Sequence, residues 1–134
     1  MIKDLFDSKG GLIAQVYHLD TIDKTSFPTP ENVTFQFGVG VNAAEKIYKT
    51  HVHKPALRKI ETTSEFLYVL EGKMVVDVYD EDHVIIETVE LGSQCALLQF
   101  YGGHGIKTEE NTKYFELKQG PYYGRDFDKY DLEV

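Results

Sequence analysis

Three histidines and one glutamate are the residues in this chain whose types and spacing best suit metal or proton chemistry. His51 and His53 are separated by one residue, so within a strand both imidazoles would project to the same face and could hold one ion. Glu65 begins a face that continues with Leu67 and Val69, and a buried carboxylate there needs a compensating partner such as a cation. A pair of surface histidines and a solvated glutamate at a strand end are the simpler alternatives.

His104 lies in the sequence Gly102-Gly103-His104-Gly105. Glycines on both sides allow close backbone approach and unusual dihedral angles, which suits a histidine that is aimed at a ligand. A plain glycine turn before a strand would leave the same pattern. Lys54 and Arg58 follow the paired histidines closely, and at the mouth of a pocket they could bind a carboxylate or phosphate. Solvated loop charges paired with Glu61 or Glu65 are equally compatible with the sequence.

The elements that must position these residues are β-strands. Short runs rich in Tyr, Phe, Val, Ile and Thr alternate with turn residues at intervals typical of a β-sandwich or closed barrel. No amphipathic helix of ten or more residues is apparent, and the segment 55–63 has room for one helical turn. The predicted strands are Leu12–His18, Val33–Val41, Ile47–His53, Glu65–Leu70, Lys73–Tyr79, Val84–Glu90, Ala96–Phe100, Gly105–Thr108 and Lys113–Lys118.

Length and charge restrict the function further. The 134 residues fit one domain, 1–134, and no linker or repeat divides them. The formal net charge of −8 disfavours binding to nucleic acid and to anionic membranes. No signal peptide or apolar span is apparent, and the single cysteine fits a reducing compartment, so we expect a cytoplasmic protein.

The order of these motifs resembles the cupin superfamily. Its first motif is matched by His51-x-His53, Glu65 and Gly72, and its second by Gly92 and Gly102-Gly103-His104. The resemblance implies an all-β jelly-roll barrel with a core of about 33–118, on which an N-terminal strand and a C-terminal tail pack. The sequence departs from the family pattern in having eleven residues between His53 and Glu65, and we interpret these residues as an inserted loop. Glu61 lies nearer the usual spacing but does not keep the register to Gly72.

The resemblance further implies that His51, His53, Glu65 and His104 bind one divalent Fe, Mn, Ni, Zn or Cu ion. Such a protein would bind or convert a small polar metabolite, either a carbohydrate or a carboxylate, as an oxygenase or isomerase, and would be a homodimer. Two alternatives remain. One is a metal-free isomerase or epimerase of nucleotide-linked sugars for bacterial surface polysaccharides, which the wording His51-Val52-His53-Lys54 resembles. The other is a non-catalytic module that only binds a small molecule. The tyrosine-rich tail, 118–130, is expected to fold back over the barrel or to pack on a partner subunit.

Overall fold

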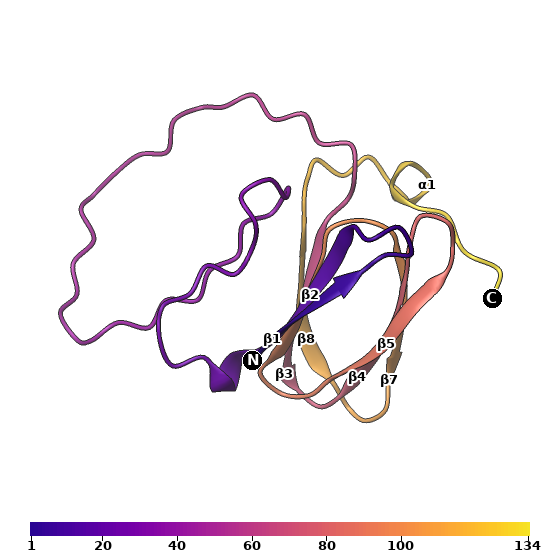
Figure 1. Cartoon of the computed structure of the whole chain (residues 1–134), viewed down its shortest axis with the longest axis horizontal. Coiled ribbons are helices and arrows are strands. Elements are labelled where there is room, and N and C mark those ends of the chain that lie inside the picture. Colours follow the sequence, from indigo (N-terminus) through magenta and orange to yellow (C-terminus); the bar gives the residue numbers. More distant parts are fainter.

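The computed structural model describes all 134 residues and consists of two antiparallel sheets packed face to face (Figure 1). The first sheet has the order β1-β2-β6-β3-β8, and the second has the order β5-β4-β7. The strands are β1 (Ile2–Phe6), β2 (Leu12–His18), β3 (Glu65–Glu71), β4 (Met74–Tyr79), β5 (Ile85–Leu91), β6 (Cys95–Gln99), β7 (Gly103–Thr108) and β8 (Lys113–Lys118). A 3₁₀ turn at Leu19–Thr21 and the one-turn helix α1 (Arg125–Asp128) are the only helical segments. No helix is long and apolar enough to cross a bilayer.

The alternation of apolar and polar residues in the strands builds the core between the two sheets. Leu67 and Val69 of β3 face Val76 and Val78 of β4, and all four are fully buried. The other face of the first sheet carries a second apolar cluster around Tyr17. Both faces of the central strands in the first sheet are therefore covered, which explains why every residue of β6 is buried.

Seven of the nine predicted strands are present, with ends within two residues of the predicted ones. The all-β prediction is confirmed at this level. The strand β1 was not predicted, because two of its five residues are charged and break the apolar alternation. In the structure only Leu5 of this strand is buried. It forms by pairing with β2 at the edge of the sheet.

The predicted strands Val33–Val41 and Ile47–His53 are wrong for this structure. Residues 22–64 contain no strand or helix, and their one ladder contact is an isolated bridge between Ser26 and Val39. A strand needs a neighbour for its backbone hydrogen bonds, and local β propensity does not supply one. The segment runs outward from the sheets as a long arch (Figure 1). It contacts the sheets near its two ends, where Phe37 stacks on Tyr17 with ring centroids 4.4 Å apart and where Ser64 is buried.

Candidate functional site

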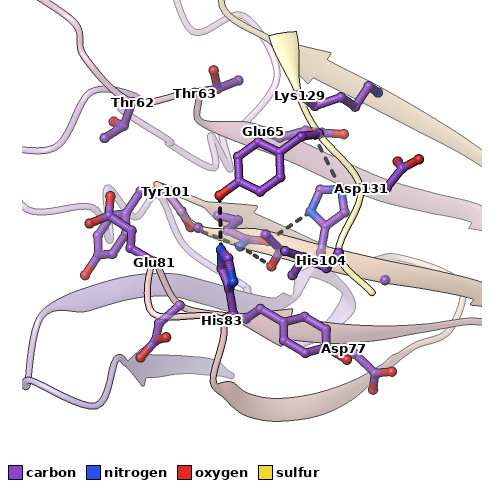
Figure 2. Close-up of a pocket in the computed structure, with 18 of the residues that line it drawn as sticks. Thr62, Thr63, Glu65, Asp77, Glu81, His83, Tyr101, His104, Lys129 and Asp131 are labelled. Carbon is purple, nitrogen blue, oxygen red and sulfur yellow. Dashed lines mark hydrogen bonds and ion pairs between the residues drawn. The ribbon is translucent and has the colours of Figure 1, made fainter. Parts of the chain in front are cut away.

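The main cavity has a volume of about 780 Å³ and lies where the two sheets separate, beside β7 and β8. Glu65 and His104 both line it, and Figure 2 shows their side chains close together. Glu65 begins β3 in the five-stranded sheet, and His104 is the second residue of β7 in the three-stranded sheet. A carboxyl group and an imidazole from different sheets therefore meet in one pocket, with 3.8 Å between Glu65 Oε2 and His104 Nε2.

The backbone before β7 aims His104 into this pocket. Gly102 has a φ of +88°, and a Cβ at this position would collide with the carbonyl oxygen of Tyr79. Only glycine fits such a left-handed conformation at a close backbone approach. The expectation that glycine around His104 serves close approach is thus confirmed at Gly102.

Gln99 fixes the tautomer of His104. The Gln99 amide nitrogen donates to the carbonyl oxygens of Tyr101 and Gly103, at 3.0 and 2.9 Å. Its Oε1 therefore faces His104 Nδ1, 3.0 Å away, and accepts a hydrogen bond from it. In the neutral imidazole the proton lies on Nδ1, and the lone pair of Nε2 points toward Glu65. His104 is thereby held as a base whose free nitrogen faces the cavity.

Glu65 is held in the opposite protonation state. Burial is the main cause that raises its pKa to about 8, and a hydrogen bond and like charge from Glu116 add to it. Counted as a carboxylate, Glu65 leaves its Oε1 buried with no hydrogen-bond partner. A proton on Glu65 lets it donate to Glu116, whose own pKa is lowered chiefly by that bond. Near neutral pH the pair therefore holds one proton, and that proton lies on Glu65.

Burial also lowers the pKa of His104, in spite of the nearby charge of Glu116. Near neutral pH the pocket thus presents a protonated carboxyl group beside a neutral imidazole. Two titratable groups whose environments push their pKa values apart form a ready acid and base. This arrangement can give a proton to one atom of a bound molecule and take one from another.

The paired histidines of the sequence lie elsewhere. The rings of His51 and His53 are neighbours, with centroids 5.1 Å apart, but both side chains are exposed on the outer arch and neither lines the cavity. Lys54 and Arg58 are exposed on the same arch. The structure therefore brings together Glu65 and His104 and separates them from the other two predicted ligands.

This separation bears on the expected metal ion. No group of three or more His, Cys, Asp or Glu side chains is placed so that it could hold a metal. Two of the four expected donors meet in the pocket, and the other two are paired outside it, so the donors within one chain do not form a complete set. Glu61, the alternative carboxylate, lines the cavity rim, where it is largely exposed and pairs with Lys59 at 3.0 Å.

Several site residues were not predicted. Gln99 contacts His104, and Glu116 contacts Glu65. The positive charge of Lys118 helps to lower the pKa of Glu116, and Lys118 forms an ion pair with Asp128 at 3.2 Å. In β8, Glu116 shares a face with Tyr114 and Lys118, so no apolar face marks it as Glu65 is marked. Its position beside Glu65 depends on the pairing of β8 with β3, in which Glu116 lies opposite Leu67.

The C-terminal tail folds back over the cavity, as one of the two expectations had it. Lys129, Tyr130, Asp131 and Leu132 line its wall. Tyr130 Oη lies 3.0 Å from His83 Nε2, a contact that joins the tail to the turn between β4 and β5. The tail therefore forms part of the pocket.

Comparisons with protein-family models, with curated proteins and with solved structures found no match.

Proposed function

We propose that this protein is a metal-independent isomerase or epimerase that acts on a small carbohydrate-like metabolite in the pocket of Glu65 and His104. The observation that carries the proposal is the meeting of two proton-transfer groups, from different sheets, in opposite protonation states. We further propose that the two sheets represent the jelly roll of a cupin-type barrel. Between β3 and β8 the chain crosses repeatedly from one sheet to the other, with only β4 and β5 consecutive in one sheet, and this path supports the assignment.

The proposed reaction moves a proton between neighbouring carbons. His104 Nε2 removes a proton from the carbon next to a carbonyl group, while Glu65 donates its proton to the carbonyl oxygen, which gives an enediol. In an isomerisation, His104 then gives its proton to the former carbonyl carbon while the hydroxyl group on the neighbouring carbon returns a proton to Glu65. In an epimerisation, His104 returns the proton to the original carbon on its other face while the hydroxyl group formed from the carbonyl returns its proton to Glu65. Atoms and electrons balance without an oxidant or a reductant. Positioned acid and base groups of this kind typically contribute about 10² to 10⁴ in rate.

The lining of the cavity favours a ligand rich in hydroxyl groups. Eight of the lining side chains are Asp or Glu and one is Lys, and tyrosines add further hydrogen-bonding groups. Carboxylates accept hydrogen bonds from sugar hydroxyls, whereas they repel phosphate groups unless cations are supplied. The volume of about 780 Å³ lies within the usual range for small-molecule sites.

Calorimetric titration with a panel of keto and aldo sugars, free and nucleotide-linked, tests the proposal. We expect one sugar class to bind to the wild type and to bind about tenfold more weakly to Gln99→Leu, which removes the acceptor that orients His104. Glu31→Gln, at an exposed position outside the cavity lining, should leave affinity unchanged. Failure of every sugar to bind, or equal binding by Gln99→Leu, would contradict a carbohydrate pocket centred on His104.

A metal centre is the second candidate function. The observations that favour it are the unpartnered Oε1 of Glu65 and the proximity of His51 to His53, which leave two incomplete pairs of donors in one chain. Elemental analysis of untagged protein separates the two candidates. Near one metal ion per chain, reduced in His53→Ala and in His104→Ala, would favour the metal centre. Metal-free protein that still binds sugar would favour the acid–base pocket.

A further inference from the structure

Residues 38–60 form an arm that does not pack against either sheet. It has no helix or strand, and it projects away from both sheets (Figure 1). Its apolar side chains stand free, since Val52 is 90% exposed and Leu57 is 103% exposed. Loops of this length without internal structure are uncommon in compact domains and usually have a function.

The arm has the sequence of a strand that lacks a partner. Val39 and Val41 end a regular apolar alternation, and Ile47–His53 carries β-branched and aromatic residues with the two histidines on one face. None of the residues from 47 to 53 makes a backbone–backbone hydrogen bond. A chain of this composition reaches a stable state by adding to an existing sheet edge.

The two sheets offer such edges on one side of the molecule. β7 ends the three-stranded sheet and β8 ends the five-stranded sheet, and a short turn joins the two strands. Neither strand buries a single residue on either face, although both carry large apolar side chains, among them Ile106, Phe115 and Leu117. Exposed edges of this kind are templates for pairing with another chain.

The charges of the arm and of the cavity beside β7 are also complementary. Residues 46–60 contain five Lys or Arg residues and no Asp or Glu. The cavity beside β7 is lined by eight acidic side chains and a single Lys, in a protein whose net charge is −8. A basic strand laid along this edge would neutralise the rim of an acidic pocket.

The base of the arm is fixed on the outer face of its own five-stranded sheet. Phe37 stacks on Tyr17, and Thr34 Oγ1 lies 2.6 Å from Ser64 Oγ, so the chain leaves and returns at one place. Ser64 is itself buried and donates to the carbonyl oxygen of Phe100 at 2.9 Å. From this anchor the arm extends away from its own β7 edge, where it is available to a neighbouring molecule.

We propose that two copies of this chain exchange arms, so that Ile47–His53 of one copy pairs with the free edge of β7 in the other. Exchange of an identical element completes both copies at low cost. It places His51, His53 and Lys54 of one chain beside Glu65 and His104 of its partner. The pocket of the proposed function, on which this assignment of the histidines rests, is then built from two chains.

Zero-length cross-linking of the native full-length protein tests the exchange. Chains labelled with ¹⁴N and ¹⁵N are unfolded, mixed, refolded together and treated with a carbodiimide, which couples lysine amines to adjacent carboxylates. We expect peptides that join Lys49 or Lys54 to Asp77 or Glu116, and that include pairs of mixed isotope. Such peptides with matched isotopes alone would overturn the proposal, because the arm would then close on its own chain. Absence of these peptides would overturn it as well.

Proline substitution provides an independent measurement. The double substitution Lys49→Pro/Thr50→Pro removes two adjacent backbone donors that are unused in the free arm, and in a paired edge strand one of the two forms a ladder bond. Because each of the two arms loses one such bond, we expect dimer dissociation, followed by sedimentation, to weaken by about tenfold or more. Ala56→Pro, outside the predicted pairing segment, should leave the dimer intact. A monomeric wild type, or equal behaviour of the two variants, would contradict the exchange.

Neither measurement depends on turnover, so failure of the exchange and failure of the proposed function are distinguishable. An exchanged dimer that binds no sugar would refute the function and keep the exchange. A monomer that binds sugar through Glu65 and His104 would refute the exchange and keep the function.

Discussion

Glu65→Gln should change how the stability of the protein depends on pH. The fold raises the pKa of Glu65 from 4.5 to about 8, mainly through burial, and its side chain is 14% exposed. Between those pH values the folded state keeps a proton that the unfolded state releases. The free energy of unfolding therefore falls as pH rises from about 4.5 to about 8, and one such proton limits the slope to about 1.4 kcal/mol per pH unit.

The separation of the two pKa values sets the size of the effect. From 4.5 to about 8 it corresponds to at most about 5 kcal/mol, and we expect about 2 to 5 kcal/mol. His104 acts in the opposite direction, because its lowered pKa makes stability rise with pH up to about its ordinary value of 6.5. Glutamine imitates the protonated acid and can donate to Glu116, so the variant keeps the His104 contribution and loses that of Glu65.

Urea unfolding followed by far-ultraviolet circular dichroism at pH 5, 6, 7 and 8 measures the effect, since the chain has no tryptophan. Relative to wild type, Glu65→Gln should gain stability steadily from pH 5 to pH 8. Glu61→Gln, at a side chain 75% exposed, is the matched control and should run parallel to wild type. If Glu65→Gln also runs parallel to wild type across this range, the assignment of a retained proton to Glu65 is refuted.

Three further predictions concern the elements that hold the site. Leu97→Ala, at a fully buried position between the sheets, should lower the free energy of unfolding by about 2 to 5 kcal/mol in urea titrations. Gly102→Ala should cost about 1 to 3 kcal/mol and should shift the ¹⁵N resonances of the His104 ring, because relief of the clash with Tyr79 moves the start of β7. Asp80 accepts hydrogen bonds from Ser8 and from two turn amides, and these lower its pKa. Wild type should therefore lose stability as the pH falls below about 3.8 in thermal melts, whereas Asp80→Asn should lose less over the same interval.

Strand positions were predictable wherever pairing partners are close in the sequence. β3, β4 and β5 follow one another through short turns, so local alternation and turn residues define them together. The two strands predicted within residues 33–53 are absent, because a strand-like sequence does not by itself supply a neighbouring strand with which to pair. β1 was not predicted because its local pattern is weak, and it forms a strand because it pairs with β2.

The candidate site was predictable only in part, for a related reason. The apolar face that begins at Glu65 and the glycines around His104 indicate two residues held in unusual surroundings, and these two meet in the pocket. Spacing within one strand could not show that Glu116 lies beside Glu65, since that contact depends on the pairing of β3 with β8. The expectation that His51 and His53 lie beside Glu65 depended on a strand at Ile47–His53, and the structure has no strand there.

Solvent deuterium exchange into a bound sugar tests the central claim most directly. In D₂O, proton NMR of a sugar that binds to the pocket should show loss of the signal from the carbon next to its carbonyl group. This loss should be about 10² or more slower with Glu65→Gln and with His104→Ala, and unchanged with Glu31→Gln, which lies outside the cavity lining. No exchange with a sugar that binds, or exchange that survives both substitutions, would contradict an acid–base pocket built from Glu65 and His104.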